Sequence, residues 1–570
     1  MRGVQRRGAV GHAADQAFAL PPDPNLAMHP DSANAYPSGN TASIWMGTFD
    51  SPDFRPLNRD LLTDVCIVGA GIAGLSTAYS LLKAGKKVVV LDDGPIGGGE
   101  SGRTTAHLTW AMDDRIYNLE SIHGAEKTRL IVESHMAAVN RIEEIVRLEG
   151  IDCDFRRVDG YLFLGPNDKR ELLEKELQAA HRAGASDVTM VERATIADYN
   201  TGPALKWPNQ GQFHVLKYLT GLANAIVAAG GEIYCGTHVS SVSGTKPGHP
   251  CRVETDDEHT VTAQSICVCT NASISDMVQT HAKQAPYRTF AIAAVVQRGA
   301  VTPGLYWDTP DPYHYVRLAP LDEPHPGVLK GDILYDALIV GGEDFKTGHK
   351  DDAVARWQRL EWWMRERWPI VGEVIYRWSG QVLEPNDYVA FIGRNPDGAK
   401  NVYMASGDSG QGMTHGTIAG ILLTDLIMGR ENPWEAVYDP RRVTLAPDAI
   451  KEFAKENADV AVQYVKDFLA PDRVDEQDIA RGEGRVVRHG LHKVAVYRDD
   501  SGTLHRRSAV CTHLKCIVEW NSGEKSWDCP CHGSRFDPYG KVLNGPAISA
   551  LSPVEQAPSE SATPEERVRE

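Results

Sequence analysis

The chain has 570 residues, of which 42% are hydrophobic, so it is long and apolar enough to bury the cores of several domains. Its net charge of −17 argues against a nucleic-acid partner, because phosphates are bound by clustered Lys and Arg. No apolar run approaches the ~20 residues that cross a membrane, and we expect no transmembrane segment.

The first segment, residues 1–42, is rich in Ala, Pro, Asn and Ser and lacks the apolar core of a secretion signal. We expect it to be a flexible leader. Six of the ten cysteines are scattered along the chain without the spacing of a disulfide framework. Together these features favour a cytoplasmic protein.

Residues 64–93 predict a strand, a glycine turn, a helix and a second strand that ends at Asp92. In this pattern Gly69 permits the tight turn, Gly71 lets a pyrophosphate approach the backbone, and Gly74 brings the helix close to the strand. The helix N-terminus attracts phosphate, and Asp92 can accept hydrogen bonds from ribose. The pattern predicts a Rossmann-like nucleotide site.

Two further segments favour FAD over NAD as the nucleotide. Residues 94–110, rich in small side chains, follow the acid directly and can run along a pyrophosphate toward a flavin. Residues 401–430 repeat the order of strand, glycine turn and amphipathic helix. No second GxGxxG unit occurs, so the sequence shows no separate NADH domain.

The motifs "VGAGIAGL", "SGRTTAHLT" and "SGDSGQGMTHG" resemble FAD-dependent oxidoreductases related to D-amino-acid, glycine and sarcosine oxidases, over about residues 63–439. The resemblance implies FAD as a cofactor. The implied FAD contacts are Gly69, Gly71, Ala73, Gly74, Asp92, Ser101, Arg103, Thr104, Thr105, His107, Thr270, Asn271, Gly407, Gly410, Gly412 and Met413. The "TTAHL" context of His107 differs from the Trp-His pattern of members with covalently attached FAD, so we expect non-covalent FAD.

The same resemblance implies the fold of residues 43–437. An α/β Rossmann-like FAD domain would comprise about 63–150, 210–280 and 388–437. An interleaved α+β substrate domain with an antiparallel sheet would comprise about 151–205 and 283–385, and would roof the flavin.

The stretch "LYWDTPDPYHYVRLAP", residues 305–320, is the best candidate for substrate contacts. Alternation along a strand places Tyr313, Tyr315 and Arg317 on one face. These are the predicted catalytic residues, because Arg binds a carboxylate bidentately and aromatic rings pack around an amine. The alternative is a half-buried strand with a surface ion pair, and Arg288 and Arg377 stay open as other carboxylate partners.

Residues 438–472 predict a helical linker, residues 473–556 a small all-β domain, and residues 557–570 a tail. Two loops of the small domain carry Cys511-x-His513 and Cys529-x-x-His532. Two Cys–His pairs suit a [2Fe–2S] cluster with thiolates on one iron and imidazoles on the other, the Rieske arrangement. A zinc site or a redox dithiol is the disfavoured alternative.

The series "CTHLKC … CPCHGS … GPA" resembles the Rieske proteins of cytochrome bc complexes. That resemblance implies a Cys516–Cys531 disulfide and cluster histidines on an exposed-loop side. Ser534 matches the hydroxyl donor of the family, whereas Lys515 stands where Gly is usual and Phe536 where a Tyr donor often stands. Losing a hydrogen bond to sulfur predicts a potential within the span of roughly −150 to +300 mV but below the respiratory extreme.

The combined prediction is an enzyme that oxidises a small amine or amino acid at a CH–NH bond. FAD would pass the electrons to the fused cluster and on to an external acceptor that the sequence does not identify, so we expect a dehydrogenase rather than an oxidase. The alternative is an electron-transfer module whose flavin is reduced by a protein partner. A closed aromatic pocket would favour the enzyme, and an open flavin edge the module.

Overall fold

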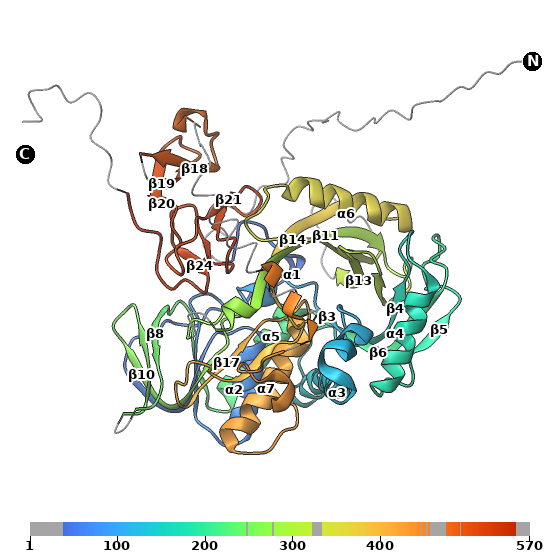
Figure 1. Cartoon of the computed structure of the whole chain (residues 1–570), viewed down its shortest axis with the longest axis horizontal. Coiled ribbons are helices and arrows are strands. Elements are labelled where there is room, and N and C mark those ends of the chain that lie inside the picture. The colour runs from blue at the N-terminus through green and yellow to red at the C-terminus, as the bar shows by residue number, and fades with distance from the viewer. Residues whose placement is uncertain are drawn as a thin grey trace, which may run out of the picture.

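The computed structural model describes residues 38–246, 249–275, 279–321, 333–444, 446–447, 449–451, 454–456, 475–490 and 492–554. Most of the predicted leader (1–37), much of the predicted linker (457–472) and the predicted tail lie outside these residues. The described chain forms a two-sheet domain, residues 38–444, and a C-terminal domain, residues 475–554, drawn in red in Figure 1. Within the described residues, no helix has the length and apolar character needed to cross a membrane.

The first sheet of the two-sheet domain has eight strands in the order β16-β17-β10-β1-β2-β7, with β8 and β9 extending from β10. Neighbours from β17 to β7 are parallel, and β16 is antiparallel at the edge. This sheet confirms the α/β prediction. The strands are β1 (Leu61–Val68), β2 (Val88–Leu91), β7 (Glu232–Tyr234), β8 (Val239–Ser243), β9 (Cys251–Thr255), β10 (Thr260–Val268), β16 (Phe391–Arg394) and β17 (Val402–Ser406).

Helices pack on this sheet (Figure 1), and two of them, α2 and α7, meet through glycine residues. A Cβ at Gly416 would lie 2.6 Å from Ile72 Cγ2, and one at Gly420 would lie 2.7 Å from the carbonyl carbon of Ser76. Only Gly allows α2 and α7 to pack this closely, so the starts of both helices lie near the same strand ends. The helices are α1 (Ile44–Thr48), α2 (Ile72–Lys83), α3 (Ile116–Glu149), α5 (Val215–Ala228), α7 (Gly412–Met428) and α8 (Glu435–Tyr438).

The second sheet has nine strands in the order β15-β11-β14-β13-β12-β4-β6-β3, with β5 paired to β6. It is antiparallel except for the β12–β4 pair, as predicted for the substrate domain. β3 joins it from a segment predicted for the FAD domain, and β6 spans the boundary between the segments predicted for the two domains. The strands are β3 (His107–Leu108), β4 (Arg156–Phe163), β5 (Thr189–Val191), β6 (Ala204–Gln212), β11 (Gln284–Gln297), β12 (Leu305–Asp308), β13 (His314–Leu321), β14 (Tyr335–Lys346) and β15 (Val374–Pro385).

Two helices accompany this sheet, α4 (Arg170–Arg182) and α6 (Ala353–Arg367). Helix α6 covers β11 and β14, and it buries Trp357, Leu360, Trp363 and Met364 at the helical spacing of three and four.

The C-terminal domain consists of two small antiparallel sheets, as predicted for an all-β domain. Trp527 and Phe536 are fully buried in its core. Its strands are β18 (Glu483–His489), β19 (His492–Arg498) and β20 (Leu504–Ser508) in one sheet, and β21 (Glu519–Asn521), β22 (Ser526–Asp528), β23 (Arg535–Phe536) and β24 (Val542–Asn544) in the other.

The described end of the predicted leader is ordered. Ser38 and Thr41 are buried, and the backbone N–H and hydroxyl of Thr41 donate to Glu524 of the C-terminal domain at 3.1 and 2.6 Å. Residues 38–42 therefore lie between the two domains instead of forming a leader.

Candidate active site and cluster site

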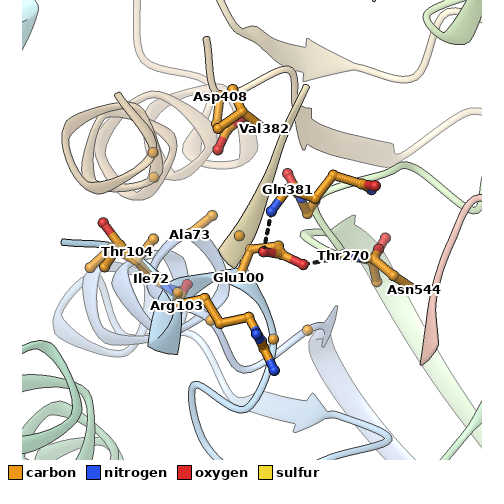
Figure 2. Close-up of a pocket in the computed structure, with 18 of the residues that line it drawn as sticks. Ile72, Ala73, Glu100, Arg103, Thr104, Thr270, Gln381, Val382, Asp408 and Asn544 are labelled. Atoms are coloured by element: carbon orange, nitrogen blue, oxygen red, sulfur yellow. Dashed lines mark hydrogen bonds between the residues drawn. The ribbon is translucent and has the colours of Figure 1, made fainter. Parts of the chain in front are cut away.

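A cavity of about 290 Å³ lies where the two sheets meet the C-terminal domain. Its wall includes the ends of β1, β2 and β17, side chains of the second sheet, and the segment after β24. Figure 2 shows labelled residues from all three parts, Ile72, Gln381 and Asn544 among them, around this cavity.

The glycine turn after β1 has the geometry that the sequence predicts. Gly69 has φ +108°, a left-handed value that favours Gly. A Cβ at Gly74 would lie 1.8 Å from the Gly69 carbonyl oxygen, and one at Gly71 would lie 2.9 Å from Ser101 Oγ. A side chain on Gly74 would therefore displace the turn, whereas one on Gly71 would push the Ser101 hydroxyl aside.

Asp92 fixes this turn in addition to lining the cavity. Its carboxylate accepts hydrogen bonds from the backbone N–H groups of Ala70 (2.5 Å) and Gly94 (2.8 Å). Burial raises the pKa of Asp92 to about 7, and the neighbouring Asp93 adds to the shift. The carboxylate thus holds the backbone around the site predicted for ribose.

Most of the other predicted FAD contacts line the same cavity, whereas Gly74 and Gly407 lie behind its wall. The Asn271 side-chain nitrogen is buried and has no hydrogen-bond partner, which fits a wall that meets a polar ligand. The predicted contacts that line the cavity are Gly69, Gly71, Ala73, Asp92, Ser101, Arg103, Thr104, Thr105, His107, Thr270, Asn271, Gly410, Gly412 and Met413.

Two helix N-termini face the cavity. Helix α2 starts after Gly71 and α7 after Gln411, and neither N-cap residue makes a side-chain capping bond. The first N–H groups of a helix attract negative charge. These ends fit the pyrophosphate and the electron-rich pyrimidine edge of FAD.

Arg103 lines the cavity but directs its charge elsewhere. Its guanidinium donates to Ser38 Oγ (2.7 Å) and to the carbonyl oxygens of Thr41 (2.7 Å) and Ser379 (2.8 Å). It also pairs with Glu524 of the C-terminal domain at 3.2 Å. In Figure 2 the guanidinium points away from Gln381. The charged end of Arg103 therefore joins the two domains instead of reaching a cofactor.

His107 is held by protein atoms on both ring nitrogens. Its Nδ1 lies 3.0 Å from Thr105 Oγ1, and its Nε2 lies 3.3 Å from the Val316 carbonyl oxygen. Burial, and then the charge of Arg317, lower the pKa of His107 to about 3, so the ring is neutral. These contacts support the prediction of non-covalent FAD.

Tyr313 and Tyr315 line the cavity, as predicted. The Tyr313 hydroxyl donates to Asp113 Oδ2 at 2.8 Å, and the Tyr315 hydroxyl lies 2.6 Å from Thr289 Oγ1. Asp344 on β14 stands on the same wall, and its Oδ1 is buried without a hydrogen-bond partner. Sequence reasoning missed Asp113, Asp344 and Thr289, because none of them belongs to a recognisable motif.

Arg317 does not line the cavity, which corrects its predicted role as a substrate contact. It is 1% exposed, and its guanidinium donates to the carbonyl oxygens of Ala106 (2.5 Å) and Phe213 (3.0 Å). The side chain is used to join backbone segments beneath the cavity wall. The two arginines considered as alternative carboxylate partners also lie elsewhere: Arg288 pairs with Asp528, and Arg377 pairs with Glu361.

The predicted cluster ligands converge at one end of the C-terminal domain. Cys511 and Cys529 are buried, and the rings of His513 and His532 lie 5.1 Å apart between centroids. His532 Nδ1 is buried and makes no hydrogen bond, as a nitrogen that ligates iron requires. Two thiols and two imidazoles on facing loops fit a Rieske cluster.

The two loops are linked as predicted by the Cys516–Cys531 disulfide. Lys515 has φ +65°, and its N–H bonds to the Cys511 carbonyl oxygen. Gly533 has φ +77° and bonds in the same way to Cys529 in the second loop. The first loop thus places Lys where its backbone favours Gly.

Ser534, the predicted hydroxyl donor, is fully buried, and its Oγ accepts from the Ala547 backbone N–H at 3.0 Å. Phe536, which stands where a Tyr donor is frequent, is fully buried in the domain core.

The cluster loops are docked on the two-sheet domain, which corrects the prediction of exposed histidines. His513 is 8% exposed, and its ring centroid lies 5.2 Å from that of His281, a residue of the two-sheet domain. The His281 ring also lies 6.2 Å from the ring of His532. In addition, Gln381 Nε2 donates to the Gly533 carbonyl oxygen at 2.9 Å.

The docked domain also forms part of the cavity wall. Asn544 and Gly545 belong to its wall, and Asn544 Nδ2 donates to Glu100 Oε1 at 3.1 Å. The second oxygen of Glu100 accepts from the Gln381 backbone N–H at 2.7 Å, as Figure 2 shows. Gln381 therefore contacts a cluster loop with its side chain and the cavity wall with its backbone.

Comparison with known proteins agrees with both sites. The family model of FAD dependent oxidoreductases matches residues 64–426, and that of the Rieske [2Fe-2S] domain matches residues 472–557. The Rieske 2Fe-2S iron-sulfur protein YhfW of Bacillus subtilis is 33% identical over 518 residues, which cover 90% of this chain and 97% of that protein.

Two further relatives resemble the two-sheet domain. Gamma-glutamylputrescine oxidoreductase of Escherichia coli is 29% identical over 67% of this chain and 88% of its own length. The crystal structure of glycine oxidase from Geobacillus kaustophilus has a TM-score of 0.54 and 17% identity, covering 67% of this chain and 99% of that one, and thus shares its fold.

With these matches, the two-sheet domain binds FAD and the C-terminal domain binds a [2Fe–2S] cluster. The chain belongs to the family of FAD-dependent oxidoreductases, and it carries a Rieske domain after the domain that defines this family.

Proposed function

We propose that the protein is a dehydrogenase that oxidises a small amine or amino acid at a CH–NH bond. Electrons would pass from FAD to the Rieske cluster and then to an external one-electron acceptor. The observation that carries the proposal is the shared wall: Asn544 and Gly545 of the C-terminal domain line the cavity that holds the predicted FAD contacts. The relative from Escherichia coli, a gamma-glutamylputrescine oxidoreductase, supports the substrate class.

FAD, when bound, supplies the two-electron oxidation of a carbon next to nitrogen, so the protein has to position the substrate and exclude water. Trp307, Tyr313 and Tyr315 form an aromatic wall on the second sheet. Burial raises the pKa of each phenol well above its usual value, so both stay protonated and can donate hydrogen bonds. This aromatic wall within a cavity favours a small-molecule substrate over reduction by a protein partner.

The number of electrons released by the substrate explains the role proposed for the Rieske cluster. Oxidation of one CH–NH bond releases two electrons and two protons and leaves an imine, whereas a [2Fe–2S] cluster accepts one electron at a time. Two successive one-electron transfers to the external acceptor therefore complete each turnover. Gln381 and Glu100 link the cluster loop to the cavity wall by hydrogen bonds, which fixes the relative position of the two sites.

The test is anaerobic mixing of the purified holoprotein with a panel of amines and amino acids. We expect flavin bleaching with at least one compound, followed by cluster reduction at a rate independent of protein concentration. A one-electron dye should also reoxidise the protein faster than oxygen does. The proposal is wrong if no compound bleaches the flavin, or if cluster reduction scales with protein concentration.

A further inference from the structure

Two carboxylates lie on the side of the cavity that carries the aromatic wall. Asp113 accepts from Tyr313, and its Oδ2 approaches Gly410 so closely that a Cβ there would lie 2.6 Å away. Asp344 lies on β14, and its Oδ1 has no hydrogen-bond partner. Both residues line the cavity. This wall therefore holds a carboxylate oxygen that no protein donor uses.

A second polar group on this wall also lacks a partner. Gln411 is 5% exposed and lines the cavity. Its Nε2 donates to the Ala111 carbonyl oxygen at 2.9 Å, but its buried Oε1 accepts no hydrogen bond. A buried acceptor without a donor is costly unless a ligand supplies one. Beside two carboxylates, the missing donor fits a cation.

Among the described residues that line the cavity, the side chains that could offset this charge are engaged or neutral. Arg103 is the one Arg or Lys in the described wall, and its guanidinium pairs with Glu524. The wall's histidines are His107, whose pKa is lowered to about 3, His415, whose pKa is lowered to about 4, and His238, which pairs with Asp93.

One cation lies close to the wall without belonging to it. Arg115 Nη1 donates to the backbone carbonyl oxygen of Asp113 at 2.9 Å, and Nη2 to that of Asp308 at 3.3 Å. Its positive charge moderates the field at Asp113. The guanidinium is bonded to backbone oxygens, so it does not offer the cavity the two-pronged clamp that binds a carboxylate.

We propose that Asp113 and Asp344 bind the ammonium group of a cationic amine, with Gln411 Oε1 as a third acceptor. The substrate class is then an amine without a carboxylate next to the reacting nitrogen, in place of an α-amino acid. This inference rests on the proposed function, because it names the substrate class of the same site.

Electrostatics support this assignment. Burial raises the pKa of Asp344 to about 7 and also raises the pKa of Asp113, so each ionised carboxylate here lacks the stabilisation that a cation would give. An α-amino acid would bring a third carboxylate into the same wall. Like charges in a poorly solvated site repel each other strongly, so the zwitterion is disfavoured.

Three compact probes of similar shape test the charge preference on the oxidised holoprotein. tert-Butylammonium is a cation, pivalate an anion and 2-aminoisobutyrate a zwitterion, and none has a hydrogen on the carbon next to nitrogen that could be oxidised. We expect tert-butylammonium to bind about tenfold more tightly than either other probe, measured by calorimetry and by the flavin spectrum. Equal or tighter binding of 2-aminoisobutyrate or pivalate would overturn the inference.

Variants test the residues themselves. Asp344→Asn keeps the shape of the side chain and removes its charge, so tert-butylammonium binding should weaken about tenfold or more. The matched control is Glu343→Gln, one position earlier, because Glu343 lies outside the cavity wall and pairs with Arg359 at 2.6 Å. Unchanged cation binding in both Asp344→Asn and Asp113→Asn would refute the assignment. Should a variant fail to retain FAD, the probe series on the wild-type protein decides alone.

Two oxidisable compounds show whether this inference or the proposed function is wrong, because the two errors give different results. Butylamine and 2-aminopentanoate differ only in the carboxylate next to the nitrogen-bearing carbon. Faster flavin reduction by 2-aminopentanoate would refute the cationic-amine assignment and leave amine or amino-acid oxidation intact. If the probes bind as expected but no compound in the panel reduces the flavin, the proposed oxidation is wrong and the binding site stands.

Discussion

Glu524 of the C-terminal domain is buried among groups of the two-sheet domain, and Glu524→Gln tests whether these contacts hold the domains together. The carboxylate, 1% exposed, accepts from Thr41 Oγ1 (2.6 Å) and Ser379 Oγ (2.5 Å) and pairs with Arg103 at 3.2 Å. Burial alone would raise the pKa of Glu524, but Arg103 and two further arginines nearby lower it. The group is therefore ionised in the folded protein.

The expected loss of stability in Glu524→Gln follows from the burial of the ion pair. Gln keeps the volume of Glu, but it leaves the guanidinium of Arg103, whose side chain is fully buried, without its counter-ion. Removing one partner of a buried ion pair costs about 3–5 kcal/mol. Because the amide oxygen of Gln can still accept a hydrogen bond, we expect the lower end, about 3 kcal/mol. This energy corresponds to a decrease of about a hundredfold in the equilibrium constant for docking of the two domains.

The assay combines denaturant unfolding of the holoprotein with anaerobic rapid mixing. Glu524→Gln should unfold at lower denaturant concentration, and its cluster should be reduced more slowly after the flavin. The control is Glu483→Gln in the same domain, because Glu483 pairs with Lys525 and both side chains are about one third exposed. Such a pair contributes about 1 kcal/mol or less. If both variants unfold alike and Glu524→Gln keeps the wild-type rate of cluster reduction, the buried ion pair does not hold the domains together.

Three further substitutions test the two cofactor sites. Gly74→Ala should give protein without FAD absorbance, because its Cβ would lie 1.8 Å from a carbonyl oxygen, whereas Gly372→Ala, outside the cavity wall and with the nearest atom 3.3 Å from its Cβ, should stay yellow. Lys515→Gly should raise the free energy of unfolding by about 1 kcal/mol, seen as a higher melting temperature, because Gly adopts φ +65° without strain. His532→Ala should lose the paramagnetic signal of the reduced cluster and keep FAD, whereas the exposed His492→Ala should keep both.

The features that sequence reasoning predicted well depend on local spacing. The glycine turn needs close approaches within six residues, and the second pair of cluster ligands lies within four, so the chain order nearly dictates their geometry. The Cys516–Cys531 disulfide was implied by a family resemblance and is present. The two sheets were predicted because the strand patterns in the sequence agree with the family topology, in which segments of the two domains alternate along the chain.

The sequence did not predict the contacts of long side chains whose partners lie far away along the chain. Arg103 lies beside the cavity as its motif predicts, but its partner Glu524 is 421 positions away in the chain. Arg317 shares its strand with Tyr315, yet its length lets the guanidinium reach carbonyl oxygens behind the wall. Asp113 and Asp344 are single acids without a motif, and only the folded sheet brings them to one cavity.

Docking of the cluster loops gives the two cluster histidines different surroundings, and under the proposed function this difference separates electron entry from electron exit. His513 is 8% exposed and packs against His281, so an external protein has little access to its ring. His532 is only partly buried and borders a small cavity that Lys346 also lines. Since electron transfer to an outside acceptor requires close approach, His532 is the better placed of the two histidines among the described residues. Gly533, the next residue of the same loop, bonds to Gln381 on the wall of the FAD cavity. Under the proposed function, this loop would receive electrons through its contact with the cavity wall and pass them on at His532, without separation of the domains.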